Sequence, residues 1–171
     1  MKEKYNQAVN FLKSGKLDKA KVLCLEILEE QPDDFDTLRL FALISFQDKN
    51  YHQSLDLISR AIKIKPDYAE IYNFYSIVLI HLKKIDEAIK SWNDAIKIKP
   101  DYAEAYYNRA NALSELRRFN EAVESYDKAI QIKPDYAEAY YNRGIALLKL
   151  GRLDEAIESY DKAIQIKPDY A

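Results

Sequence analysis

The sequence has few residues that break helices. Its 171 residues include only three glycines and five prolines, whereas an all-β fold needs many of both for its turns. Hydrophobic residues make up 48% of the chain, which is enough apolar surface to build a core. The abundance of alanine, leucine, isoleucine, lysine and glutamate favours helices. We therefore expect an all-α fold.

The sequence also lacks a large net charge, a second cysteine and a long apolar run. The chain has 26 basic and 28 acidic residues, so nothing favours binding to nucleic acid or to an anionic membrane. A single cysteine, Cys24, excludes an intramolecular disulfide and a cysteine-based metal site and is typical of a reducing compartment. No apolar run approaches the roughly 18 residues that span a bilayer, and no secretion signal is recognisable. We expect a cytoplasmic protein without nucleic-acid or membrane partners.

The prolines recur at a fixed period of 34 residues, at Pro32, Pro66, Pro100, Pro134 and Pro168. This period divides the chain into repeats 1–34, 35–68, 69–102, 103–136 and 137–170, and Ala171 begins a sixth. The last two repeats are identical at 26 of 34 positions. A period of this length predicts an array of stacked helical units. We therefore expect one array over residues 1–171.

Each repeat contains two stripes of apolar residues at helical spacing. In the fourth repeat, Tyr106 and Ala110 belong to the first stripe, and Ala122 and Tyr126 belong to the second. The proline near the end of each repeat stops the second helix, because it cannot donate a hydrogen bond to the preceding turn. The pattern predicts ten helices of about 12–14 residues.

The residues between the stripes suggest where the helices begin and end. Gly151 suits the end of a helix, and Asn120 and Asp154 suit N-caps. Asp135, followed three residues later by Glu138, has the spacing of a capping box.

The repeat resembles the tetratricopeptide repeat. It has tyrosine at the fourth position, a small residue at the eighth, alanine at the twentieth and twenty-seventh, tyrosine or tryptophan at the twenty-fourth and proline at the thirty-second. The resemblance covers essentially the whole chain and is most specific in repeats three to five. The second repeat departs mildly, with Ser54 and Ile58, and the first departs more, with Lys4, Cys24 and Ile27.

This resemblance implies a right-handed superhelix of five helix hairpins whose first helices line a concave face that recognises a protein or an extended peptide. No catalytic constellation emerges: His52 and His81 occupy different positions of the repeat, and most carboxylates lie at helix starts or beside lysines. We therefore expect a non-enzymatic scaffold without a cofactor or metal. The alternatives are a substrate-recognition arm of a larger enzyme, such as a glycosyltransferase with these repeats, and a self-assembling module.

The resemblance assigns the concave face of repeats four and five to polar residues. The candidates are Tyr107, Asn108, Asn111, Tyr141, Asn142 and Lys149. Asn108 and Asn142 match an asparagine ladder of some family members, in which side-chain amides pair with the backbone of an extended ligand. The alternative is a surface asparagine in a string that is common in the family.

The corresponding positions of the first three repeats are apolar, and the candidates there are Leu43, Phe74 and Ile77. An apolar stripe along a groove suits an apolar peptide or an amphipathic helix. The alternative is partial burial of these side chains against neighbouring helices.

Arrays of this kind usually close with a polar helix, and none follows the fifth repeat in this sequence. We expect the second helix of that repeat to expose Ile157, Tyr160 and Ile164. This pattern predicts that the chain is truncated at its C-terminus and that copies pack end to end.

Overall fold

The computed structural model describes residues 2–168, and this part of the chain contains ten α-helices and no strand. The helices are 12–14 residues long, so the predicted all-α class, helix number and helix lengths are confirmed. The chain forms two compact units, Met1–Lys84 and Ile85–Ala171. The boundary between them falls between the two helices of the third repeat.

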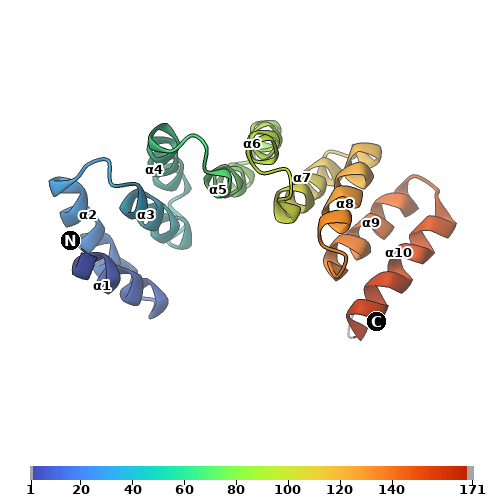
Figure 1. Ribbon diagram of the computed structural model, residues 1–171, viewed down its shortest axis with the longest axis horizontal. Coiled ribbons are helices and arrows are strands. Elements are labelled where there is room, and N and C mark those ends of the chain that lie inside the picture. Colours follow the sequence, from blue (N-terminus) through green and yellow to red (C-terminus); the bar gives the residue numbers. More distant parts are fainter. Residues whose placement is uncertain (1, 169–171) are drawn as a thin grey trace. The chain divides into compact units, whose positions relative to one another are not determined.

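The first unit, called unit 1 below, holds five helices. They are α1 (Lys2–Lys13), α2 (Leu17–Glu30), α3 (Phe35–Gln47), α4 (Tyr51–Ile64) and α5 (Ala69–His81) (Figure 1). Each helix packs on the next along the chain, and α1 also contacts α3. Because α3 has neighbours on several sides, most of its residues are buried, including Leu38, Phe41 and Ile44.

The second unit, called unit 2 below, holds the other five helices. They are α6 (Ile85–Ile98), α7 (Ala103–Glu115), α8 (Phe119–Ile132), α9 (Ala137–Lys149) and α10 (Leu153–Ile166) (Figure 1). Here too each helix packs on the next one, and α7 also contacts α9.

Small side chains lie where the helices approach each other. The eighth position of each repeat is fully buried or nearly so and holds Ala8, Ala42, Ser76, Ala110 and Gly144. The twentieth position is also buried and holds Ala20, Ser54, Ala88, Ala122 and Ala156. Large side chains on one helix can enter the grooves beside such residues on the next.

Gly144 shows how close this approach is in the last hairpin. A β-carbon on Gly144 would lie 2.6 Å from the ring of Tyr160, which is closer than any real contact. In the fourth repeat the same two positions hold Ala110 and Tyr126, both of them buried. Tyr160 is therefore a packing residue of the α9–α10 hairpin as well as a member of the predicted open face.

Each hairpin turns through one residue with a left-handed backbone. The described residues with positive φ are Gly15, Lys49, Lys83, Arg117 and Gly151, with φ between 59° and 74°. All five occupy the same position of the repeat. Glycine adopts this conformation without steric cost, whereas a residue with a β-carbon is strained. Gly151 therefore ends its helix as the sequence predicts.

The N-caps differ from the sequence prediction. Helix α8 has Arg118 as its N-cap and α10 has Arg152, so Asn120 and Asp154 lie inside the first turns. The reason is the short left-handed turn, which lets the second helix begin two residues after it. Both N-cap arginines instead form two-pronged ion pairs with the glutamate three residues later, at 2.6–2.7 Å.

The predicted capping box is also wrong. The N-cap of α9 is Tyr136, whose side chain makes no capping hydrogen bond. Asp135 lies one residue before the cap and belongs to the turn that follows Pro134, where its carbonyl accepts a hydrogen bond from Ala137 N at 3.0 Å. Glu138 is then only the second residue of the helix, and a capping box needs the third.

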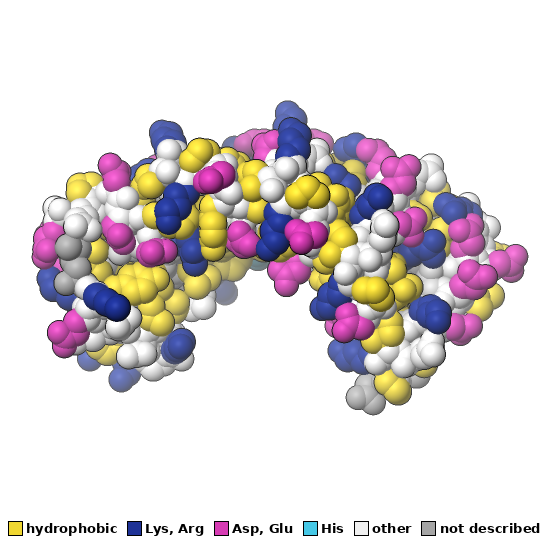
Figure 2. Space-filling model, in the orientation of Figure 1, with side chains coloured by type: hydrophobic (Ala, Val, Ile, Leu, Met, Phe, Trp, Pro, Cys, Tyr) yellow, Lys and Arg dark blue, Asp and Glu magenta, His cyan; other side chains and the backbone are white. Residues whose placement is uncertain are grey.

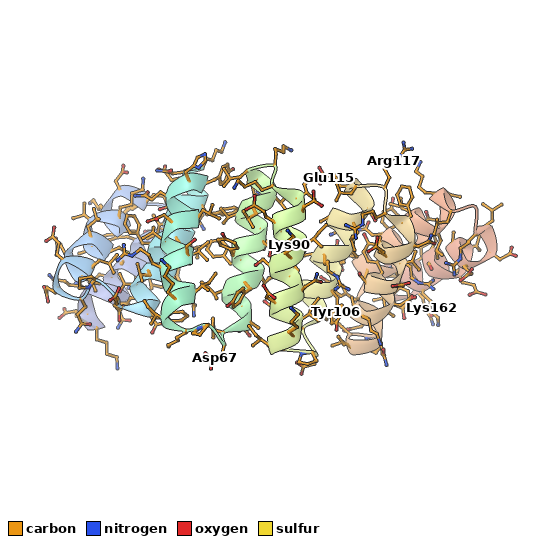
Figure 3. All side chains as sticks on the ribbon, turned by 90° about the horizontal axis from the view of Figure 1, so that it is seen from above. Asp67, Lys90, Tyr106, Glu115, Arg117 and Lys162 are labelled. Carbon is orange, nitrogen blue, oxygen red and sulfur yellow. The ribbon has the colours of Figure 1, made fainter. Side chains whose placement is uncertain are left out.

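Replacing Arg117 with glycine should stabilise the chain by about 1 kcal/mol. Arg117 is exposed at the turn between α7 and α8 (Figure 3), and the substitution removes the strain of a left-handed arginine, partly offset by the entropy of glycine in the unfolded chain. Urea unfolding should show a higher midpoint with an unchanged slope.

The matched control is Gly151→Ala, which should destabilise by about 1 kcal/mol. No atom lies within 4 Å of a β-carbon at this position, so this loss would report backbone strain alone. A destabilised Arg117→Gly variant would contradict the argument.

Candidate interaction surfaces

In unit 1, the first helices of the repeats, α1, α3 and α5, form an apolar groove. The groove has a volume of about 250 Å³ and is lined by Tyr5, Arg39, Leu40, Leu43, Tyr68, Glu70, Ile71 and Phe74. Two of the predicted residues, Leu43 and Phe74, lie in it. Leu43 is exposed and Phe74 is half-buried, as is the third predicted residue, Ile77, which does not line the groove. Figure 2 shows hydrophobic side chains gathered on unit 1 over α1 and α3.

Arg39 fixes one wall of this groove. Its guanidinium lies over the rings of Tyr68 and Phe35, at 5.2 and 5.6 Å from their centroids, and its Nη1 donates a hydrogen bond to the Tyr68 hydroxyl at 3.1 Å. Phe35 and Tyr68 themselves meet edge to face at 5.4 Å. Such stacking orders the long arginine side chain, so this wall is formed before any ligand arrives. Arg39 was not among the residues that the sequence analysis singled out.

A second groove adjoins the first at Tyr5. It has a volume of about 240 Å³ and is lined by Lys2, Tyr5, Ile27, Gln31, Asp34, Asp36 and Thr37. Asp34 caps α3 by accepting a hydrogen bond from Thr37 N at 2.8 Å. The Thr37 hydroxyl is buried and has no hydrogen-bond partner within residues 2–168. Partial burial, together with nearby Asp36, raises the pKa of Tyr5 above its ordinary value.

The far side of Phe74 packs in a cluster of aromatic rings. Phe46 lies between Phe74 and His81, at centroid distances of 5.6 and 4.9 Å. His81 also stacks on Tyr51 at 4.7 Å. These contacts join α3, α4 and α5 and hold Phe74 in place at the groove.

In unit 2 the predicted polar residues bind one another. The side-chain nitrogen of Asn142 donates hydrogen bonds to Asn111 Oδ1 and to the Tyr107 hydroxyl, both at 3.1 Å. The hydroxyl of Tyr126 donates a third bond, to Asn111 Oδ1, at 2.6 Å. The two bonds of Asn142 use both hydrogens of its amide, which leaves its carbonyl oxygen as the group that could meet a ligand.

The other predicted residues of unit 2 lie around this network. Asn108 is half-buried, and Tyr141 and Lys149 are exposed. Tyr141 packs on Tyr160 at a centroid distance of 5.7 Å. Tyr107 also packs on Tyr136, at 4.8 Å, and burial raises the pKa of Tyr136.

Two arginines, which the sequence analysis did not single out, bridge neighbouring repeats of unit 2. Arg109 donates to Asn93 Oδ1 at 2.7 Å and to Ser125 Oγ at 3.0 Å. One repeat later, Arg143 donates to Asp127 Oδ1 and to Ser159 Oγ, both at 2.6 Å. In each case an arginine of the first helix joins the second helix of its own repeat to the second helix of the preceding one. The signal in the sequence was an arginine followed by a serine 16 residues later, in both of the last two repeats.

These arginines are partly buried and firmly held. Burial lowers the pKa of Arg109, against the opposing influence of nearby Tyr106 and two glutamates. Arg143 forms the floor of a groove of about 520 Å³ between α8 and α10. The groove carries both acidic and basic side chains, among them Asp127, Asp161 and Lys162. Figure 3 shows Lys162 on α10 and Tyr106 on α7.

Within residues 2–168, no group of three or more histidine, cysteine or acidic side chains is arranged to hold a metal ion. In the same part of the chain, no helix has the length and hydropathy to cross a bilayer. Cys24 is fully buried, and its surroundings raise the pKa of its thiol to about 12, so it serves as a packing residue.

Two family profiles match the chain. One, described as tetratricopeptide repeat, matches residues 107–171, and the other, described as TPR repeat, matches residues 78–116. The chain belongs to the tetratricopeptide repeat family. A search of curated protein sequences gave no match.

Solved structures with the same fold include MamA and YrrB. A crystal structure of MamA is 23% identical, with a TM-score of 0.89 and 95% of each chain covered. MamA from Desulfovibrio magneticus RS-1 is 17% identical, with a TM-score of 0.88, over 98% of this chain and 95% of that one. YrrB, described as a TPR protein with an unusual peptide-binding site, is 20% identical, with a TM-score of 0.80, over 97% and 86%. This tetratricopeptide repeat protein is thus an all-α helical repeat solenoid.

The polar network of unit 2 should contribute measurably to stability. Replacing Asn111 with alanine leaves the buried Tyr126 hydroxyl without its acceptor, so we expect a loss of about 1–2 kcal/mol in the free energy of unfolding. The control is Asn120→Ala, at an exposed position of α8, which should change stability by less than about 0.5 kcal/mol. Equal effects of the two substitutions in urea unfolding would show that the network is not stabilising.

Alkaline pH should weaken the same region. Burial raises the pKa of Tyr126 to about 12, above the value of about 10 in an unfolded chain. The stability that this tyrosine contributes is therefore complete below pH 10 and is lost as the pH rises towards 12. Between pH 8 and pH 11, the wild type should lose about 1 kcal/mol more than Tyr126→Phe. Identical losses in chemical unfolding at the two pH values would rule out this linkage.

Proposed function

We propose that this chain is a non-enzymatic protein-interaction scaffold that binds an apolar peptide segment in the groove of unit 1. The observation that carries the proposal is the groove itself, which offers the exposed Leu43 and the half-buried Phe74 to a ligand above the buried Ile71. A preformed concave surface with an apolar floor and a few polar groups is the usual form of a binding site.

The chemistry of the walls narrows the class of ligand. Arg39 is already paired with aromatic rings and with the Tyr68 hydroxyl, so it serves as a wall rather than as a free cation. Across the two grooves three acidic side chains, Asp34, Asp36 and Glu70, outnumber Arg39 and Lys2, and Asp36 Oδ1 lies 3.9 Å from Arg39 Nη1. A segment with two or three apolar side chains and a basic neighbour would complement both features.

The adjoining groove adds polar groups that a ligand can reach. Lys2, Gln31 and Asp36 line it and are exposed. The two grooves share Tyr5, so one extended segment could lie along both.

The structural neighbours support the same class of function. YrrB is described as having a peptide-binding site, and the two folds agree closely. The polar surface of unit 2 is a weaker candidate, because Asn142 uses its donors within the network.

The test is selection of peptides from a random library displayed on phage, followed by affinity measurements on the full chain. Selected sequences should be enriched in apolar residues beside a basic one, and Leu43→Asp should weaken their binding about tenfold or more. Leu43 is exposed, so the substitution should leave the fold intact.

The matched control is Val22→Asp on α2, at another exposed apolar position outside both grooves. It should leave the affinity unchanged. If the two substitutions weakened binding equally, the groove of unit 1 would not be the binding site.

A further inference from the structure

Lysines gather on one edge of unit 1, around the C-terminal ends of α1, α3 and α5. This edge comprises residues 13–21, 47–52 and 81–84 and is called the turn edge below. It has seven lysines and only two aspartates, whereas the rest of unit 1 has ten acidic and six basic residues. Unit 1 is therefore almost neutral as a whole but strongly polarised. The exposed lysines of the turn edge are Lys13, Lys16, Lys19, Lys49, Lys83 and Lys84.

Side-chain contacts join the three turns into one row. Lys21 of α2 forms an ion pair with Asp48, the C-cap residue of α3, and its Nζ lies 3.8 Å from Asp18 Oδ1. Tyr51 at the start of α4 stacks on His81 at the end of α5, with 4.7 Å between the ring centroids. Since helices that pack together lie about 10 Å apart, the three turns extend over about 20 Å.

The exposed lysines of this row are not neutralised within the chain. Lys21 engages both aspartates of the turn edge. Four of the exposed lysines form no ion pair with any residue of the described range 2–168, namely Lys13, Lys16, Lys49 and Lys83. The corresponding turns of unit 2, residues 115–123 and 149–157, have four basic and four acidic residues. There Arg118 and Arg152 each bind the glutamate three residues later.

Two of these lysines occupy backbone positions that suit glycine. Lys49 and Lys83 have φ values of 59° and 62°, and the same position of the first repeat holds Gly15 with a φ of 72°. A residue with a β-carbon is strained in this conformation, and retained strain is an indication of function. At both turns the strain keeps an exposed cation at the tip.

The length of the row limits what it can bind. An extended peptide advances about 3.3 Å per residue, so about seven residues would span the three turns. The next charged residues after Lys84 are the acidic Asp86 and Glu87, and acidic residues outnumber basic ones in the rest of unit 1. A long polyanion or a membrane surface would meet this negative charge as well. A short acidic segment matches the row better.

We propose that the turn edge of unit 1 binds an extended acidic segment of a partner protein. Acidic residues about three positions apart in that segment contact successive turns. Lysines act here as point charges, so the affinity falls as the salt concentration rises. The residues of the turn edge line neither groove of unit 1, so this site does not depend on the proposed peptide groove.

The probe is a fluorescein-labelled peptide with four copies of the sequence Glu-Gly-Ser. Fluorescence anisotropy with the full chain at about 50 mM salt should show saturable binding that weakens about fivefold or more at about 300 mM salt. A peptide of the same composition with its four glutamates adjacent should bind more weakly, because it reaches fewer turns.

The test variant is the double substitution Lys49→Gly and Lys83→Gly. It removes two cations and relieves two strained turns, so it should be at least as stable as the wild type. It should bind the spaced peptide about fivefold or more weakly. The matched control, Arg117→Gly, makes the same kind of change at the same position of a repeat in unit 2 and should leave the affinity within about twofold.

The proposal would be overturned by no saturable binding of the spaced peptide, by equal binding of the two peptides, or by equal effects of the double variant and Arg117→Gly. Tighter binding of a single-stranded oligonucleotide or of phosphatidylserine vesicles would also overturn it and assign the edge to those polyanions. Salt-dependent self-association that the double variant abolishes would assign the edge to a second copy instead. Leu43→Asp should leave binding of the acidic peptide unchanged, so failure of the groove and failure of this site are separable.

Discussion

A helix hairpin of this kind has more apolar surface than it can bury by itself, so every helix depends on a neighbour from the next repeat. The contrast between Val123 and Ile157 shows this dependence at one position of the repeat: the first is covered and the second is open. The buried alanines, serines and one glycine let the neighbours come close enough. Nearest-neighbour packing, rather than one central core, therefore determines stability.

Polar contacts then give the two units different surfaces. In unit 2, arginines and asparagines bind residues 16 to 35 positions away in the sequence, and their donors are largely used within the unit. In unit 1, aromatic and aliphatic side chains occupy the corresponding helices, and Arg39 is held by rings. The surface that remains available to a ligand is therefore apolar in unit 1.

The period of the prolines was enough to predict the helices, because helix positions follow from apolar spacing and from proline geometry. The N-caps could not be predicted this way, because they depend on the left-handed residue at each turn, which is arginine or lysine in three hairpins. The sequence alone also suggests that the amide of Asn142 is free on the helix surface, whereas in the structure it donates two hydrogen bonds within unit 2.

Leu43 and Phe74 were predicted because an apolar side chain on a first helix is visible in the sequence. Asn142 was predicted too, but its partners lie 31 and 35 residues earlier. Only the stacking of α9 beside α7 brings them together. Thr37 and Arg39 gave no signal, because their roles depend on burial and on rings from other helices.

The one-sided packing of α10 also affects how the chain opens. In an array held together by neighbouring contacts, a helix covered on one face has the lowest free energy of local opening. Amide hydrogens of α10 should therefore exchange with solvent before those of α8, and a protease should first reach the chain near this helix. Anything that covers Ile157 would slow both processes, because local opening would then have to break a second set of contacts.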